Sequence, residues 1–386
     1  MAVTTSERTR PGRIDLSLFR HADMVLLALP FAISALGLLM IYSSTKTRLA
    51  NQGLSKLYYV ERQSLAIVIG VAAMAVVLAI DYRRIRDLWA LVYIGALPLL
   101  FGVLVVGQRH KGAQAWFQVG PLQFQPSEIT KVVVVVALAG YCHQHREDLD
   151  TRRLAVAISL AGLLMALVFL QHDLGTTLVI LVCSFSVLVV AGLRPAHVVA
   201  LVMIGVSLVG FAVLTGRVAA YRVDRIVGFL DQGNTNQPAS KQTEAQYSLS
   251  ESKIAIVNGG LTGEGLFKGR QTNLAYVPEQ HTDFIFTVVG EELGFAGGAT
   301  LIGLYSVLVW RVWRTARVSA DFFGTLLCVG VLGILAFQVF ENIGMTMGIM
   351  PITGIPLPFM SYGGSAIIAS FIAIALVANV HMRRFS

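Results

Sequence analysis

The chain has 386 residues, of which 55% are hydrophobic and only 13% are charged, and its formal net charge is +8 at pH 7. Because a soluble domain carries about 25% charged residues, this composition excludes a water-soluble globular protein and indicates a polytopic membrane protein. The positive charge implies no nucleic-acid partner, since cytoplasmic arginines that contact anionic lipid head groups account for most of it.

Ten apolar stretches of roughly 20 residues predict ten membrane-spanning helices. Residues 1–23 are polar and lack the short apolar core of a cleavable signal sequence. We therefore expect an all-α polytopic membrane protein with a cytoplasmic N-terminal tail, 1–23, and a single membrane domain, 24–386. In chain order the stretches are 24–42, 63–80, 88–106, 127–142, 154–171, 174–192, 198–215, 284–310, 322–342 and 364–381.

Lysine and arginine predict the orientation, because cytoplasmic loops carry an excess of both. With the N-terminus inside, sixteen of these cations fall on cytoplasmic segments and six on short outer loops. The long loop at 217–283 carries seven more, and loops of this length cross the membrane largely regardless of charge. Both termini are therefore expected in the cytoplasm, and the long loop outside.

Two irregular segments are expected on the outer face. The loop at 217–283 joins the seventh and eighth helices, and connections this long are usually functional. Within it, residues 244–260 predict a short helix that ends at Gly259 and Gly260. The stretch 344–364 is rich in proline and glycine, so it must be buried in protein or line a cavity at membrane level.

The stretch PEQHTDF, residues 278–284, places Glu279, His281 and Asp283 where the long loop meets the eighth apolar run. One interpretation is a capped helix start, with Thr282 or Asp283 as the N-cap. The other is a reactive carboxylate at the membrane surface. Desolvation there favours a general base, whereas a helix N-terminus stabilises the ionised form. The residues alone leave both interpretations open.

Other polar groups stand inside or beside the apolar runs. Glu128 and Lys131 follow Pro126 at i and i+3, so they can form an ion pair that either fixes packing or offers Lys131 to an anionic substrate. Asp173 lies at the turn between the fifth and sixth helices, where it either caps the backbone or joins the site.

Further candidates lie around the eighth helix. Glu291 and Glu292 point about 100° apart, so only one of them can face the same cavity as Asp283. Glu341 and Asn342 stand in a similar position on the ninth helix. A group of cations in the long loop could approach a phosphate, although each alone is also typical of a solvated face; it comprises Arg222, Arg225, Lys253, Lys268 and Arg270.

Seven motifs, in order, resemble the SEDS family of shape, elongation, division and sporulation proteins. The resemblance covers nearly the whole chain and implies ten membrane helices in a GT-C-like fold. KGAQAWF, residues 111–117, is more similar to the RodA elongation branch than to the FtsW division branch. The motifs are MIYSST (40–45), FQPSEITK (124–131), QHDLGTTL (171–178), IAIVNGGLTGEGL (254–266), PEQHTDFIF (278–286), GEELGFAG (290–297) and MGIMPITGIPLPFMSYGGS (347–365).

The resemblance implies a peptidoglycan glycosyltransferase that polymerises lipid II at the outer face of the bacterial cytoplasmic membrane during cell elongation and shape maintenance. It implies a class B penicillin-binding protein as partner, which supplies the transpeptidase. It places the essential aspartate at Asp283, as general base for the GlcNAc 4-hydroxyl. The expected substrate-binding residues are Glu128, Lys131, Arg225, Lys268, Arg270, Asp173, Gln125 and Ser361. Supporting side chains around them are expected to be His281, Glu279, Glu291, Glu292 and Thr282.

Two positions depart from the family's pattern. Ala115 stands where many relatives have an arginine, which removes one phosphate ligand. His172 replaces a common proline, which makes the turn at Asp173 less rigid. Neither departure touches the motif that contains Asp283.

Cofactors and competing functions complete the expectations. The histidines show no metal-ligand spacing, and a divalent cation such as Mg or Mn at the substrate pyrophosphate would have no dedicated protein cage. Intramembrane charges and broken helices are also typical of transporters, so a lipid II flippase could use the same residues as a head-group pathway. An FtsW-like division polymerase and a non-catalytic scaffold for the transpeptidase are the remaining alternatives.

Overall fold

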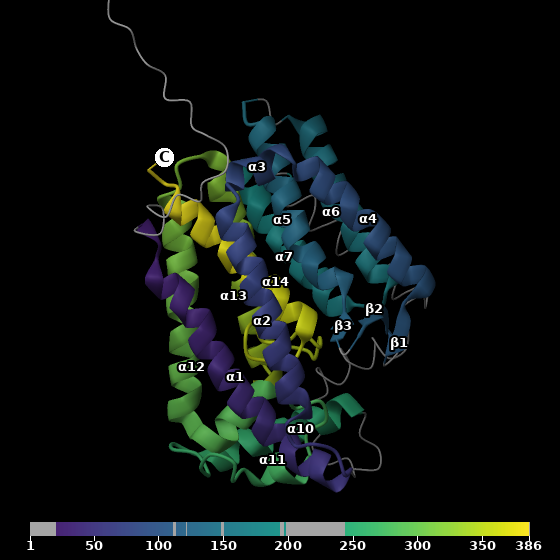
Figure 1. The fold of residues 1–386 in the computed structure, drawn as a ribbon, viewed down its shortest axis with the longest axis vertical. Helices are drawn as coiled ribbons and strands as arrows, with labels where there is room; N and C mark the ends of the chain where they lie inside the picture. Colours follow the sequence, from purple (N-terminus) through teal and green to yellow (C-terminus); the bar gives the residue numbers. More distant parts are fainter. Residues whose placement is uncertain are drawn as a thin grey trace, which may run out of the picture.

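The computed structural model describes residues 21–110, 113–120, 122–147, 150–193, 197 and 244–385, which form the elongated bundle of helices in Figure 1. The predicted seventh span, 198–215, lies outside the described residues, as do Arg222 and Arg225. The helices are α1 (Met24–Asn51), α2 (Tyr58–Ala79), α3 (Tyr82–Asp87), α4 (Trp89–Val106), α5 (Pro126–Gln144), α6 (Thr151–Leu170), α7 (Leu174–Ala191), α10 (Glu244–Gly259), α11 (Arg270–Leu274), α12 (Ile285–Arg317), α13 (Phe322–Met347) and α14 (Gly364–Met382).

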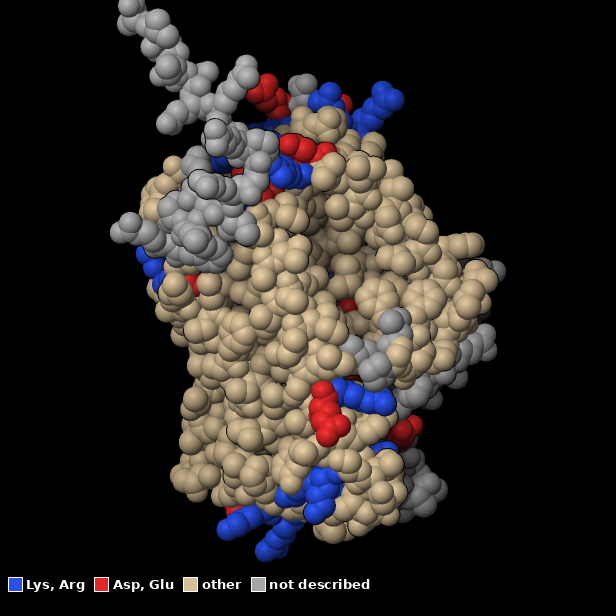
Figure 2. All heavy atoms as spheres, in the orientation of Figure 1, with Lys and Arg blue, Asp and Glu red and all other residues tan. Residues whose placement is uncertain are grey.

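Eight of the described helices are long and apolar enough to cross a membrane, namely α1, α2, α4, α6, α7, α12, α13 and α14. α5 lies among them in the bundle, and its two charged residues lower its hydropathy. These helices correspond to all the predicted spans that fall on described residues, so the all-α multi-pass fold is confirmed there. Figure 2 shows the matching surface, with charged side chains gathered at the two ends and a broad uncharged band between them.

Several of these helices have an aspartate as their N-cap. Asp23, Asp150, Asp173 and Asp321 are the N-caps of α1, α6, α7 and α13, and each accepts a hydrogen bond from the backbone N–H three residues later. Such a bond satisfies one of the donors that a helix start leaves unpaired. Asp173 therefore acts as the backbone cap that the turn at 171–175 predicts.

A three-stranded antiparallel sheet lies between α4 and α5 in the sequence. The sequence analysis did not predict this sheet. Its strands are β1 (Gln108–His110), β2 (Ala113–Val119) and β3 (Leu122–Phe124), in the order β1-β2-β3. Phe117 pairs with Phe124, and Gly120 supplies the positive φ of 58° at the β2–β3 turn. β3 leads directly into α5, so the sheet fixes where the FQPSEITK motif enters the bundle.

α5 is the central helix of one half of the bundle and packs against α4, α6, α7, α13 and α14. Nearly all of its side chains between Pro126 and Cys142 are buried. α2 packs along α14, where Gly70 allows the Phe371 ring to approach closely. α10 and α11 lie together at one end of the molecule, called the α10 end below, and the C-terminus lies at the other (Figure 1).

α12 is broken at Gly294, which has φ 65° and ψ −162°. The loop 259–265 fills the break and replaces the lost helical hydrogen bonds. The N–H groups of Phe295 and Ala296 donate to loop carbonyls at 2.9 and 3.1 Å, and loop N–H groups donate to the carbonyls of Glu291 and Glu292 at 2.9 and 3.1 Å. A kink in a buried helix is stable when such partners satisfy its backbone.

Candidate active site

The stretch 278–284 forms a tight turn immediately before α12. Glu279 has a left-handed φ of 50°, and its carbonyl accepts hydrogen bonds from the N–H groups of Thr282 (3.2 Å) and Asp283 (3.1 Å). The Thr282 hydroxyl donates to the same oxygen at 3.1 Å. α12 has Phe284 as its N-cap and no side-chain cap. The interpretation of Thr282 or Asp283 as the N-cap is therefore wrong.

The Asp283 side chain is half-buried. Opposite it lies Gly354, with φ 75°; a Cβ added to this glycine would lie 3.4 Å from Asp283 Oδ2 and, beyond its chain neighbours, within 4 Å of no other described atom. The buried Asn342 amide donates to the carbonyls of Asp283 and Ile355, both at 2.8 Å. α13 thus holds the turn and the glycine side by side.

The irregular segment 348–363 also contacts the start of α7. A Cβ added to Gly175 would lie 3.0 Å from the carbonyl oxygen of Thr353. On the other side, the Thr353 hydroxyl donates to Glu341 Oε1 at 3.0 Å. None of the side chains from 350 to 364 is exposed, so the expectation of a buried, non-helical segment is confirmed there. The expectation is wrong at 344–347, which continue α13, and Met347 and Ile349 are exposed. The segment connects the Asp283 turn with the Asp173 turn.

Asp173 joins the starts of α5 and α7. Its Oδ1 accepts from the N–H of Thr176 at 2.9 Å, and its Oδ2 accepts from the Gln125 amide at 2.8 Å and the Ser127 hydroxyl at 3.1 Å. Its neighbour His172 has φ 66°, a conformation that proline cannot adopt. The turn is therefore built differently from one that carries proline at this position.

Glu128 and Lys131 form the expected ion pair, with Lys131 Nζ 2.8 Å from Glu128 Oε2 and both side chains about 4% exposed. Val135 lies on the same face of α5 by helical spacing, and it contacts Gly330 of α13. The pair therefore faces the interior between α5 and α13. A buried pair of this kind is stable only while both partners are present.

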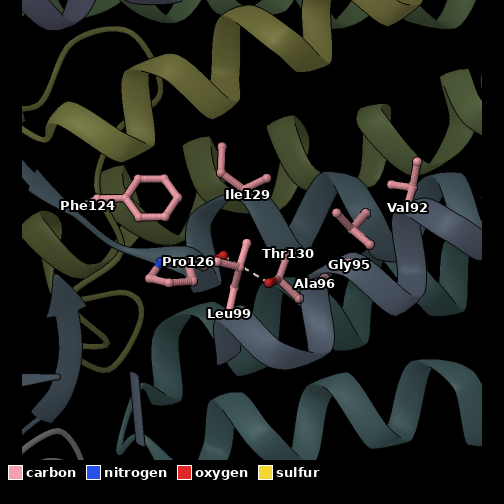
Figure 3. Close-up of a pocket in the computed structure, with 9 residues that line it drawn as sticks. Val92, Gly95, Ala96, Leu99, Phe124, Pro126, Ile129 and Thr130 are labelled. Carbon is pink, nitrogen blue, oxygen red and sulfur yellow. Dashed lines mark hydrogen bonds between the residues drawn. The ribbon is translucent and has the colours of Figure 1, made fainter. Parts of the chain in front are cut away.

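The opposite face of α5 borders an apolar hollow of about 210 Å³ against α4. Figure 3 shows Phe124, Pro126 and Ile129 on the α5 side, with Val92 and Leu99 among the α4 residues. Thr130 also lines the hollow, and its hydroxyl donates to the Pro126 carbonyl at 2.9 Å. The hollow therefore offers a hydrocarbon surface beside the start of the FQPSEITK motif.

Glu291 and Glu292 face the segment 267–272, which follows the loop at the break in α12. Glu291 is fully buried and accepts from the N–H groups of Gln271 and Thr272 at 2.6 and 3.0 Å, at the start of α11. Glu292 accepts from the Phe267 N–H at 3.0 Å and from the Ser43 hydroxyl. Both carboxylates therefore hold the segment that leads into α11.

Two described cations of the long loop, Lys268 and Arg270, are exposed, whereas Lys253 on α10 is half-buried. Lys268 and Arg270 lie at the start of α11, with their backbone N–H groups bonded to Gly265 and Glu264 of the same loop. Their side chains are therefore available at the surface of the α10 end. Arg225, the third expected loop ligand, lies outside the described residues.

His281 and Ser361 connect the turn to the segment before α14. The His281 ring packs 4.6 Å from the Tyr59 ring and 5.6 Å from the Tyr362 ring, and its carbonyl accepts from the Tyr362 N–H at 2.9 Å. Burial raises the pKa of the Tyr362 hydroxyl. The Ser361 hydroxyl is 4% exposed and accepts from the Leu357 N–H at 2.9 Å, so it stabilises the segment.

The sequence analysis missed Gln63, a buried residue on α2. Its amide donates to the Ser361 carbonyl at 3.0 Å, and its Oε1 accepts from the Gly363 N–H at 3.1 Å. The Gln63 side chain thus provides hydrogen-bond partners for backbone groups of the non-helical segment that have no helical partner. A polar residue at the beginning of an otherwise apolar run was the available signal.

The described residues contain no group of three or more His, Cys, Asp or Glu side chains that could hold a metal ion. Glu341 accepts a hydrogen bond from Thr353, and Asp173 accepts hydrogen bonds from Gln125 and Ser127.

Comparison with known proteins places these features in one family. The model of the cell cycle protein family of FtsW, RodA and SpoVE matches residues 23–385. A probable peptidoglycan glycosyltransferase FtsW of Geobacter metallireducens is 32% identical over 375 residues, covering 96% of this chain and 97% of the relative. The peptidoglycan glycosyltransferase MrdB of Escherichia coli is 34% identical over 369 residues, 94% of each chain.

Two solved structures share the fold. A chain from a study of how a peptidoglycan synthase complex coordinates polymerization and crosslinking superposes with a TM-score of 0.76 at 32% identity, covering 95% of this chain and 99% of that one. The rod shape determining protein RodA of Thermus thermophilus superposes with a TM-score of 0.69 at 32% identity, covering 95% and 98%. Similarity thus extends along the whole described chain.

Proposed function

This chain belongs to the FtsW, RodA and SpoVE family, and on that premise we propose that it polymerises lipid II into glycan strands at the outer face of the cytoplasmic membrane, with Asp283 as the general base. Glycosyltransferase activity is the established part, since relatives that match over more than nine-tenths of their length carry it in their names. The lipid II substrate, the outer side of the membrane and the role of Asp283 as base are the parts that we propose.

The juxtaposition of Asp283 and Gly354 supports the assignment of the base. Asp283 Oδ2 lies 3.4 Å from the position of a Cβ added to Gly354, and Asn342 holds both segments through backbone carbonyls. A general base must reach the proton that it removes, at about 2.6–3.2 Å between heavy atoms. Asp283 is half-buried, whereas Glu291 and Glu292 are fully buried and accept hydrogen bonds from loop N–H groups.

The reaction that fits this geometry is a single displacement. The 4-hydroxyl oxygen of the acceptor GlcNAc forms a bond to the anomeric carbon of the donor as its proton passes to Asp283. The bond from that carbon to the pyrophosphate oxygen breaks, and undecaprenyl pyrophosphate leaves with the electron pair. One displacement inverts the anomeric centre, so an α-linked donor gives a β product.

The negative charge on the leaving pyrophosphate must be neutralised by cations. We assign this role to Lys131, which Glu128 orients, and to Lys268, Arg270 and Arg225 of the long loop. The apolar hollow between α4 and α5 supports a lipid-linked substrate, because its hydrocarbon lining adjoins the start of the motif that carries Lys131. The sugars would react at the α10 end while the lipid tails remain in the bilayer.

The biological role in this proposal is cell elongation with a class B penicillin-binding protein. Its support is the KGAQAWF motif and the similarity to the synthase-complex chain, whose title joins polymerization to crosslinking. Relatives named for both the FtsW and the MrdB branches match at similar identity. The alternative is that the same polymerase activity serves cell division.

The test is polymerisation of labelled lipid II by the purified protein together with a class B penicillin-binding protein. Asp283→Asn should lower the rate about 10²- to 10⁴-fold, the usual contribution of a general base. Asp87→Asn is the matched control, because that side chain is 64% exposed at the opposite end. Polymer made by Asp283→Asn at the wild-type rate would contradict the base assignment.

A second arm of this test separates a polymerase from a transporter. The broken helix α12 and the interior Glu128–Lys131 pair are features that transporters also use. Wild-type protein in vesicles should therefore be assayed for lipid II movement as well. Translocation without glycan product would favour the flippase.

A further inference from the structure

A buried series of polar side chains, called the Gln280 chain, runs from α12 through α11 to the turn and back to α12. The Thr272 hydroxyl donates to Glu291 Oε2 at 2.6 Å. The Gln280 amide Nε2 donates to the hydroxyl oxygens of Thr272 (3.0 Å) and Thr287 (3.3 Å). The Thr287 hydroxyl donates to the Phe284 carbonyl at 2.6 Å. All four side chains are at least 96% buried.

The direction of these hydrogen bonds leaves one role for Gln280. A threonine hydroxyl has a single proton, and both hydroxyls give theirs away, to Glu291 and to the Phe284 carbonyl. Each hydroxyl oxygen can then only accept a further bond. The primary amide carries two N–H groups, so Gln280 supplies one donor to each.

The Gln280 chain contacts the turn on both sides of Asp283. Gln280 lies three residues before Asp283, and the Phe284 carbonyl, which accepts from Thr287, follows directly after Asp283. The backbone of Asp283 itself is held from the other direction by Asn342 of α13. Because Glu279 has a positive φ and its carbonyl accepts several N–H bonds, the turn is compact and internally hydrogen-bonded. Its orientation therefore depends on these outside contacts.

We propose that Gln280 is a positioning residue: through Thr272 and Thr287 it sets the orientation of the turn, and so the direction in which the Asp283 carboxylate faces the space at Gly354. The inference rests on the proposed function, in which Asp283 is the base. Gln280 touches no substrate in this role. Its effect is on the alignment of the base with the acceptor hydroxyl, where a misplacement of about 1 Å can cost about 10²-fold in rate.

Gln280→Met is the primary variant, since it keeps the length and the apolar part of the side chain. Both threonine hydroxyls retain their donated bonds in this variant, so no donor becomes unpaired, and we expect the protein to fold. Thr287→Val and Thr287→Ser form a matched pair that removes or keeps the hydroxyl on α12. Thr300→Val is the control, because that exposed hydroxyl donates only within α12, to the Ala296 carbonyl.

The experiment measures kcat and KM for labelled lipid II, with the pH dependence of kcat, per mole of folded complex. Gln280→Met and Thr287→Val should lower kcat about 10-fold or more with KM changed less than about 2-fold. The apparent pKa of the kcat profile should shift in the same two variants. Thr287→Ser and Thr300→Val should behave as the wild type. A role in stability alone would change the melting temperature without changing kcat per folded molecule or the pH profile.

The outcomes separate the two proposals. If Asp283→Asn is inactive while Gln280→Met and Thr287→Val have wild-type kcat, the positioning role is wrong and the base assignment stands. If Asp283→Asn itself polymerises at the wild-type rate, the base assignment is wrong, and the positioning role falls with it. If Gln280→Met does not fold, the comparison of Thr287→Val with Thr287→Ser decides, and equal kcat in that pair overturns the inference.

Discussion

Asp283 owes its position to contacts between its turn and other elements of the fold. Asn342 of α13 holds its carbonyl, Tyr362 donates to the carbonyl of His281, and Gln280 reaches Thr272 and Thr287. The side chains of Asp173 and Glu128 are held in the same way, by hydroxyl, amide and ammonium groups that satisfy their lone pairs. A polar group in this bundle is stable because a specific partner is present.

The Glu128–Lys131 pair provides a prediction at the residue scale. Lys131→Ala leaves the carboxylate of Glu128 buried without its partner, which should lower the free energy of unfolding by about 3–5 kcal/mol. The double variant Glu128→Gln/Lys131→Met removes both charges and should regain most of that stability. It should still polymerise lipid II poorly if Lys131 neutralises pyrophosphate. Equal activity of the double variant and the wild type would remove Lys131 from the site.

Gly354 provides a second prediction at this scale. Gly354→Ala places a methyl group in the space at Asp283 Oδ2 and strains a backbone with φ 75°, so polymerisation should fall at least about 10-fold. Gly53→Ala is the control, since Gly53 has φ 69° and open space around it. Both variants carry similar backbone strain, so a difference in rate isolates the occupied space. Equal rates of lipid II polymerisation in the two variants would contradict the assignment.

The elements of the site are interrupted helices and the segments that fill their gaps. α12 breaks at Gly294, and the loop 259–265 supplies its missing partners, while α13 and α14 are separated by the non-helical segment 348–363 that Gln63 supports from α2. The sequence motifs GLTGEGL and GEELGFAG therefore belong to one structural unit. Gly259, Gly263 and Gly294 are needed because the two backbones approach there more closely than a side chain would permit.

Gly263 tests this unit. A Cβ at Gly263 would lie 2.1 Å from the Glu292 carbonyl oxygen, so Gly263→Ala should displace the loop from the break in α12. Gly260→Ala shares the positive φ but meets nothing within 4 Å. The first variant should therefore melt several degrees below the second, with faster hydrogen exchange at the N–H groups of Phe295 and Ala296. Matching melting temperatures would show that the loop does not support the break.

At the scale of the whole molecule, the charged ends and the uncharged band define how the chain sits in a bilayer. Figure 2 shows this arrangement, and the eight spanning helices with α5 account for it. The excess of arginine at the end away from α10 predicts that the Asp283 turn faces outward. The acceptor and donor sugars would then meet outside the cell while the hollow at α4 remains within the bilayer.

The orientation is measurable with single cysteines. The three native cysteines, Cys142, Cys183 and Cys328, are buried and should not react. Ser55→Cys, in the exposed connection between α1 and α2, should be labelled in intact cells by a membrane-impermeant maleimide. Ala320→Cys, exposed between α12 and α13, should be labelled only after the cells are opened. The reverse pattern would place the Asp283 turn in the cytoplasm.

The sequence by itself determined the membrane class, the position of each described span, the helix at 244–260 and the ion pair of Glu128 with Lys131. These features are local: apolar length, spacing along one helix and glycine or aspartate at an end are all read over a few turns. The predicted ends of the spans were less accurate, since α1 continues to Asn51 and α12 to Arg317, beyond the predicted ends at 42 and 310. The strands at 108–124 were not predicted because they are short and are stabilised by pairing with one another and by packing on the bundle.

Only the tertiary structure decided which acids are fully buried among loop N–H groups and which one lies half-buried at the turn. Glu291 and Glu292 look equivalent to Asp283 in the sequence, yet a loop that begins about 30 residues earlier supplies their hydrogen-bond donors. Asp283 is left beside Gly354, with Asn342 between them as the shared support. The physical reason is that a carboxylate's role depends on its partners, and here those partners come from segments that only the folded chain brings together.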